Sequence, residues 1–195
     1  MWRSWTKILT AAFMVTLFAC NEDMPDEGDL SSIPYNPVSY DPNLPDYLPK
    51  LTTPADNPLT VDGINLGRHL FFDNILSGNG TMSCASCHDP KKAFTDGNAV
   101  SVGIDGISGK RSSMSLVNVG FTKNGLFWDG RAATLEDQAL LPVTDPIELH
   151  TTWTDVENRL RSHASYPTLF RKAFGIKNKS EISKTLAAKA IAQYQ

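Results

Sequence analysis

The stretch Ser83-Cys84-Ala85-Ser86-Cys87-His88 decides how this sequence is interpreted. Two cysteines separated by two residues and followed at once by a histidine form the C-x-x-C-H pattern, which attaches haem c. About one helical turn separates the two thiols, so both can bond to the vinyl groups of a single haem while His88 reaches the iron. We therefore expect Cys84 and Cys87 to hold one covalent haem c, with His88 as an axial ligand of its iron.

Two other uses of paired cysteines remain open at this point. A thioredoxin-like dithiol also has the C-x-x-C spacing, but it needs a βαβ setting that the surrounding sequence does not show. A structural zinc site needs four ligands, usually from a second C-x-x-C, and the chain has only three cysteines. Both alternatives are weaker than haem attachment.

The chain from residue 50 to residue 195 has the composition of one folded domain. It carries 16 of the 18 basic residues and 14 of the 21 acidic residues, so it is nearly neutral. Helical periodicity predicts helices over 60–72 and 134–141, each opened by a threonine cap. It also predicts a third helix that begins with a Thr154–Glu157 capping box and a fourth that is opened by Ser180. No strong strand alternation is present, so we expect an all-α fold.

The first twenty residues have the pattern of an export signal. Arg3 and Lys7 precede a mostly apolar run over 8–19, which is too short for the roughly 20 residues of a membrane-spanning helix. The ending Leu-Phe-Ala-Cys over 17–20 is similar to a lipobox, the signal of bacterial lipoproteins. We expect a signal peptide over 1–19, lipidation of Cys20, and a location in the periplasm or cell envelope with a lipid anchor in the membrane. An ordinary signal peptide that happens to contain a cysteine is the alternative.

Residues 20–57 differ in composition from the rest of the chain. The interval 20–49 holds seven acidic and no basic residues, and eight of the twelve prolines lie between Pro25 and Pro58. Proline and like charge both disfavour helices and central strands, which predicts an acidic, extended tether and strap over 20–57 and a domain over 58–195. A net charge of −3 gives no reason to expect a nucleic-acid partner.

Several short motifs together resemble those of a known family, the bacterial di-haem cytochrome c peroxidases. This family includes the di-haem enzyme that matures methylamine dehydrogenase. The resemblance covers the N-terminal half of the family and rests on NPLT (57–60), LGRHLFFD (66–73), LS (76–77), SCASCHDP (83–90), AFTDG (93–97) and FWDGRA (127–132). It implies a cytochrome-c-like helical domain whose haem meets hydrogen peroxide, while a second haem domain takes electrons from a small cytochrome c or cupredoxin.

The resemblance also implies roles for individual side chains. Gln138 is similar to a distal-pocket glutamine, and Glu148 to the acid-base glutamate that moves a proton between the two oxygens of peroxide. Trp128 matches the aromatic residue that carries electrons between the haems, and Arg131 is a possible partner of a haem propionate.

Each of these residues has a simpler interpretation. Glu148 follows Asp-Pro-Ile, which is also a helix start with a capping glutamate. Gln138 could be an exposed helix residue, Trp128 a core residue, and Arg131 the partner of a carboxylate.

The sequence departs from the family pattern at two loops. Where classical members carry a histidine that blocks the iron, this chain has Val-Gly-Ile-Asp-Gly over 102–106, and Ile104 cannot ligate iron. We expect an open or water-bound peroxide side, with five other side chains as the remaining candidate ligands: Met82, Met114, His69, His150 and His163. The stretch Lys-Arg-Ser-Ser-Met over 110–114 lacks the family's calcium-site asparagine, which argues against calcium.

The leading hypothesis is an exported peroxidase module that reduces hydrogen peroxide. A mono-haem electron-transfer protein without turnover is the alternative, and a lipoprotein that only binds a partner is a third. One haem motif where the family has two, and an end inside an amphipathic helix at Gln195, predict that the 195 residues are part of a longer two-haem protein.

Overall fold

The computed structural model describes residues 28–195. The predicted signal peptide and Cys20 lie outside the described residues. The described part is mostly helical, and its only β-pairing consists of isolated bridges. Six α-helices and four 3-10 turns follow one another in the order α1 (Val61–Phe72), η1 (Asn74–Leu76), α2 (Cys84–Cys87), η2 (Pro90–Lys92), η3 (Val119–Phe121), α3 (Leu135–Thr144), α4 (Trp153–Ser162), α5 (Tyr166–Phe174), η4 (Lys179–Glu181) and α6 (Lys184–Tyr194).

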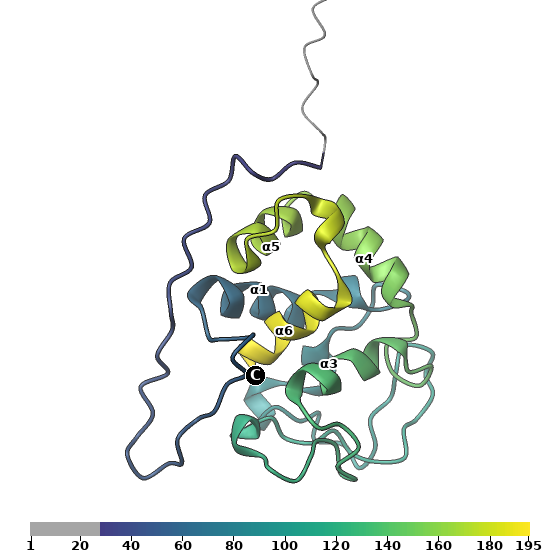
Figure 1. The fold of residues 1–195 in the computed structure, drawn as a ribbon. Helices are drawn as coiled ribbons and strands as arrows, with labels where there is room; N and C mark the ends of the chain where they lie inside the picture. The colour runs from purple at the N-terminus through teal and green to yellow at the C-terminus, as the bar shows by residue number, and fades with distance from the viewer. Residues whose placement is uncertain (1–27) are drawn as a thin grey trace, which may run out of the picture.

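Helices α1 and α6 pack against each other at the centre of the molecule. In Figure 1, α4 and α5 lie on one side of this pair and α3 lies on the other. The close approach depends on Gly67 of α1, because a Cβ atom at this position would lie 1.9 Å from the carbonyl oxygen of Ala190 in α6. The main core around these helices is built from aliphatic and aromatic side chains such as Leu66, Leu70 and Phe170, all fully buried.

Two of the predicted helices begin where their threonine caps indicate. The side chain of Thr60 accepts a hydrogen bond from Gly63 N at the start of α1, and the side chain of Thr134 accepts one from Asp137 N at the start of α3. Both caps satisfy amide groups that the first helical turn leaves free. Helix α3 continues past the predicted end at residue 141 and includes Pro142.

The other two predicted helix starts are wrong by two and by three residues. Helix α4 is capped by Thr152, whose hydroxyl accepts from Asp155 N, so Thr154 is already inside the helix. Its supposed capping partner Glu157 instead accepts from Lys184 N at 2.7 Å and so caps α6.

Ser180 lies inside the short turn η4, and α6 is opened by Ser183. An extended residue between the two, Ile182, turns its fully buried side chain into the core, which interrupts the helical pattern. Helix α5 was not predicted, although Pro167 in its first turn and Gly175 at its end are ordinary helix boundaries.

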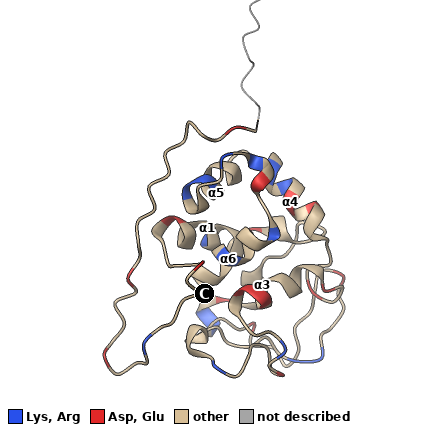
Figure 2. Ribbon diagram, viewed as in Figure 1, with Lys and Arg blue, Asp and Glu red and all other residues tan. Residues whose placement is uncertain are grey.

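The segment over 28–60 contains no helix and contacts the folded part near both of its ends. Leu30 is almost fully buried, and its N–H donates to the Lys177 carbonyl at 2.8 Å. At the other end Val61 N donates to Val38 O at 2.9 Å, so the intervening loop leaves and rejoins the domain at α1 (Figure 1). Four of the five charged residues in this segment are acidic, whereas α5 contains the basic residues Arg171 and Lys172 (Figure 2).

A largely buried polar network fixes the end of this segment to helices α3 and α6. Asn57 donates to Glu136 of α3 at 2.7 Å and to the Lys189 carbonyl of α6 at 3.1 Å. Gln193 of α6 donates to Asn57 at 2.8 Å and accepts from Thr60 N at 3.0 Å. Among residues 28–195, no helix is both long and apolar enough to cross a membrane.

Candidate haem and peroxide site

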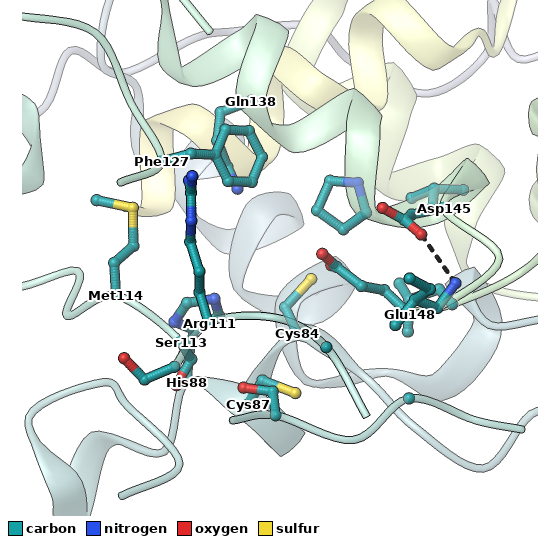
Figure 3. Close-up of a pocket in the computed structure, with 18 of the residues that line it drawn as sticks. Cys84, Cys87, His88, Arg111, Ser113, Met114, Phe127, Gln138, Asp145 and Glu148 are labelled. Atoms are coloured by element: carbon teal, nitrogen blue, oxygen red, sulfur yellow. Dashed lines mark hydrogen bonds between the residues drawn. The ribbon is translucent and has the colours of Figure 1, made fainter. Parts of the chain in front are cut away.

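A cavity of about 410 Å³ lies between α2, α3 and the loops that connect them. Its wall contains many apolar side chains, such as Val102, Phe127 and Ile191. The remaining wall comes from α2, α3, the end of α6 and the segments 101–103, 109–114, 127–129 and 145–149. Figure 3 shows that side chains from distant parts of the chain converge on this space.

The helix α2 presents both cysteines of the C-x-x-C-H motif to the cavity. It is a single turn whose N-terminus is closed by reciprocal bonds, since Ser86 N donates to Ser83 O and the Ser86 hydroxyl accepts from Ser83 N, both at 3.0 Å. Cys84 and Cys87 are both free thiols. Burial raises the pKa of Cys84 to about 12 and also raises that of Cys87, so both are neutral thiols at pH 7.

His88 is held as a neutral ring through its Nδ1 atom. Its Nδ1 lies 2.9 Å from the carbonyl oxygen of Phe94. A carbonyl oxygen can only accept, so Nδ1 carries the proton and Nε2 keeps its lone pair. Burial lowers the pKa of His88 below its ordinary value, which favours the neutral form that ligates metals. Two thiols and a neutral imidazole facing one partly apolar cavity are the donor set that haem c requires.

Gln138 and Glu148 line the same cavity as the haem motif. Gln138 projects from α3 and is 7% exposed, so its interpretation as an exposed helix residue is wrong. Figure 3 shows the Glu148 side chain directed toward the space that Cys84 also reaches. The Glu148 carboxylate is close enough to raise the pKa values of both cysteines by its charge.

Glu148 does not cap a helix. Residues 146–149 form a turn that follows the end of α3, and among the described residues no hydrogen bond to the Glu148 carboxylate is found. Glu148 is exposed by surface area and lies in the wall of the cavity. Burial first, and then the nearby Asp145 carboxylate, raise the pKa of Glu148 above the ordinary value.

Two loops hold the Glu148 turn in place, and sequence reasoning did not foresee this. Ile104 N donates to the Glu148 carbonyl at 3.0 Å, and Gly78 N donates to Leu149 O at 2.7 Å. Gly103 packs so closely that a Cβ atom there would lie 1.6 Å from the carbonyl oxygen of Ile147. Ile104 packs on the core and is not part of the cavity wall.

Trp128, Arg131 and Arg111 form the exposed rim of the cavity. Trp128 is 62% exposed, so the core interpretation is wrong, and its indole N–H donates to Ser112 O at 2.8 Å. Asp129 binds Arg131 at 3.0 Å and Arg111 at 2.9 Å, and the Arg131 guanidinium lies 3.5 Å from the centre of the Phe127 ring. Arg111 belongs to the stretch 110–114, which the sequence connected only with calcium, and it was not singled out as a site residue.

The other candidate iron ligands divide into two groups. Met82 and Met114 line the cavity, whereas the three remaining histidines do not. His150 pairs with Asp105, His163 packs against Tyr166, and His69 lines a separate surface depression beside Phe72.

A helical fold around a cavity with a C-x-x-C-H motif is the architecture of c-type cytochrome domains. Residues 61–195 match the family model described as di-haem cytochrome c peroxidase. The chain belongs to this family.

The relatives include enzymes and a solved structure of about twice this length. The chain is 37% identical over 151 residues to the methylamine utilization protein MauG of Methylophilus methylotrophus, covering 77% of this chain and 43% of that protein. It is 37% identical to the cytochrome c551 peroxidase of Pseudomonas aeruginosa, covering 64% of this chain and 36% of the other. A crystal structure of a MauG-like protein associated with microbial copper homeostasis is 37% identical and matches 80% of this chain and 46% of its own, with a TM-score of 0.73. The chain therefore spans less than half the length of these relatives.

Proposed function

We propose that this chain is the peroxidatic domain of a haem c enzyme that reduces hydrogen peroxide with electrons from a small redox donor, a cytochrome c or a cupredoxin. The observation that carries the proposal is one cavity with Cys84, Cys87 and His88 in its wall together with Gln138 and Glu148. One haem c, bound covalently to the two thiols with His88 as iron ligand, would supply the metal centre and the electrons for breaking the peroxide O–O bond.

Glu148 is the residue we assign to proton transfer. A base that moves a proton between the two oxygens of peroxide must be free of strong partners and must have a pKa near the working pH. Among the described residues the Glu148 carboxylate has no ion-pair partner, and burial and Asp145 shift its pKa upward from the ordinary value, which is toward neutrality. The turn that carries it is fixed by Ile104 and Gly78, so the carboxylate is oriented before peroxide arrives.

Gln138 and the rim residues have supporting roles in this proposal. The buried Gln138 amide can donate to or accept from a peroxide oxygen without changing charge. Trp128 is exposed at the rim, where an aromatic ring can pass electrons between this domain and a partner domain. Arg131 and Arg111 are cations at the same rim and can pair with haem propionates in addition to Asp129.

The proposal for the location of the protein rests on the sequence of residues 1–20. We propose export to the periplasm or cell envelope and lipid attachment at Cys20. Intact-mass measurement of the protein from a bacterial envelope fraction tests this, because loss of 1–19 and a lipid adduct on Cys20 are expected. An unmodified thiol at the new N-terminus would contradict it.

The decisive experiment for the peroxidase proposal measures the reaction of the ferric haem protein with peroxide by stopped-flow absorbance. We expect a rapid change of the Soret band in the wild-type protein. Glu148→Gln should retain the haem but lower the second-order rate constant by about 10²- to 10⁴-fold.

Asp137→Asn is the matched control, because Asp137 is an exposed carboxylate on the same helix as Gln138. Its rate constant should equal that of the wild type. A wild-type protein that binds haem but does not react with peroxide would favour the mono-haem electron-transfer alternative. An unchanged rate in Glu148→Gln would remove Glu148 from the mechanism.

A further inference from the structure

The AFTDG motif over 93–97 forms a strained turn directly beside the haem motif. Ala93 and Phe94 have φ values of 53° and 56°, which place two consecutive residues with side chains in the left-handed region. Such residues persist only where the surrounding structure holds them. The carbonyl of Phe94 is the group that accepts the hydrogen bond from His88 Nδ1 at 2.9 Å. The strain is therefore located at the group that orients the proposed iron ligand.

Contacts from three directions hold this turn. The Ser115 hydroxyl donates to the Ala93 carbonyl at 2.6 Å, and Asp89 N donates to Thr95 O at 3.1 Å. The Phe94 ring packs edge-on against the fully buried Phe71, with ring centres 6.4 Å apart. The turn that carries the Phe94 carbonyl is thus held by the core through the Phe94 ring and by hydrogen bonds to the carbonyls of the two neighbouring residues, Ala93 and Thr95.

Asp96 places a buried carboxylate in the same turn. It is 7% exposed, and its Oδ1 accepts from Asn98 N at 2.9 Å and from the Ser113 hydroxyl at 3.1 Å. These hydrogen bonds outweigh burial and lower the pKa of Asp96, so the group is an anion at neutral pH. The carboxylate is two residues from the Phe94 carbonyl that binds His88 Nδ1, and the residue before it, Thr95, accepts from Asp89 N directly after His88, so the charge lies in the turn that holds the ligand.

Lys92 is a cation beside this carboxylate, but its ammonium group binds the Asp96 backbone and not the carboxylate. Lys92 Nζ donates to the Asp96 backbone carbonyl at 2.9 Å, and the Lys92 residue is largely exposed to water, which screens its charge. Burying an anion without an ion-pair partner is costly. The neutral side chain of an asparagine could accept the same hydrogen bond from Asn98 N, so the turn does not require a charge. The charge itself therefore calls for an explanation.

We propose that Asp96 is a positioning residue that tunes the haem through His88: its turn fixes the imidazole through the Phe94 carbonyl, and its carboxylate holds negative charge beside the ligand and so favours oxidised over reduced iron. Groups behind a metal ligand commonly set its basicity and the reduction potential of the metal. The inference rests on the proposed haem site, and it adds a residue that neither touches the haem nor handles peroxide.

The test is the reduction potential of the haem, measured by spectroelectrochemical titration of the haem-loaded protein. Asp96→Asn should shift the equilibrium toward ferrous haem at least tenfold, which corresponds to 59 mV for one electron. Asp96→Glu, which keeps the charge, should remain within about twofold of the wild type, since charge rather than shape is responsible.

Asp46→Asn is the matched control, because it removes the same charge from an exposed position in the N-terminal segment. We expect no measurable shift in this variant. Equal potentials in Asp96→Asn and Asp46→Asn would overturn the inference, and so would an Asp96→Glu variant that shifts as far as Asp96→Asn. A protein that never acquires haem would instead refute the proposed haem site.

A second pair of variants covers the case in which Asp96→Asn does not hold haem. Asp96→Ser removes the charge but keeps a hydroxyl that can accept from Asn98 N, and it should raise the potential. Lys92→Gln removes the neighbouring cation and should lower it, by less than Asp96→Asn raises it because Lys92 is exposed. If neither Asp96→Asn nor Asp96→Ser holds haem, Lys92→Gln becomes the deciding variant. An unchanged reduction potential in Lys92→Gln would then overturn the inference.

Discussion

Replacing Gly67 by alanine tests how closely α1 and α6 are packed. A Cβ atom at residue 67 would lie 1.9 Å from Ala190 O, 2.6 Å from Ala190 C and 2.9 Å from the Cβ of Tyr194. Real Cβ atoms essentially never approach closer than 3.0 Å, so α6 would have to recede by at least 1.1 Å, the difference between 3.0 and 1.9 Å. The obstacle is backbone, which cannot rotate away as a side chain can.

The magnitude follows from two opposing effects. Overpacking of this kind costs about 1–3 kcal/mol and falls at the upper end here, while alanine gains about 1 kcal/mol over glycine in helix propensity. We expect a net loss of about 2 kcal/mol in the free energy of unfolding. Ile191 and Gln195 of the same helical segment line the cavity, so the displacement should also loosen the haem environment.

Urea unfolding of the haem-loaded protein, followed by far-ultraviolet circular dichroism, measures this loss. Asn65→Ala is the control, because residue 65 is exposed on the same helix and should gain about 0.5 kcal/mol from propensity alone. A Gly67→Ala protein as stable as Asn65→Ala would refute the argument that these two backbones touch.

Two further substitutions probe the surroundings of the Glu148 turn. Arg159 donates to Ile75 O at 2.9 Å, to Ser77 O at 2.6 Å and to the Thr151 hydroxyl at 2.9 Å. Arg159→Ala should lower the free energy of unfolding in urea by about 2–3 kcal/mol, because these acceptors lose a charged donor. A change below about 0.5 kcal/mol would contradict this. Because the folded-state pKa of Glu148 is raised, its ionised form destabilises the fold at neutral pH, and Glu148→Gln should be more stable than the wild type at pH 7. This advantage should shrink as the pH falls through the raised pKa and vanish below the ordinary value of 4.5, and an advantage that persists at pH 3 would contradict the shift.

The sequence predicts those parts of the fold that depend on local chemistry. The threonine caps before α1 and α3 directly precede the first apolar residue of the helical pattern, Val61 and Leu135, so their positions follow from the sequence. Before α6, Ser180 and Ser183 are equally good caps, and the choice depends on the burial of Ile182 by distant helices. Such long-range packing leaves no periodic signal in a short segment.

The candidate site shows the same division between local and distant determinants. The C-x-x-C-H motif predicts that Cys84 and His88 share one surface, because one helical turn joins them. The Asp-Pro-Ile-Glu stretch is equally typical of a helix start and of a turn, and only the docking of Ile104 and Gly78 onto it shows that Glu148 is in a turn. The exposure of Trp128 could not be predicted either, since an aromatic residue is more often buried.

The contacts of the N-terminal segment impose an order on the folding of the chain. Ile33 is joined to Arg171 across 138 residues of sequence, and Thr60 to Gln193 across 133. Contacts so distant in sequence form late, because closing long loops slows folding. During synthesis from the N-terminus, Cys84 and Cys87 emerge before α6, whose end forms part of the cavity wall. Under the proposed haem attachment, both thiols are therefore accessible before the wall of the cavity is complete.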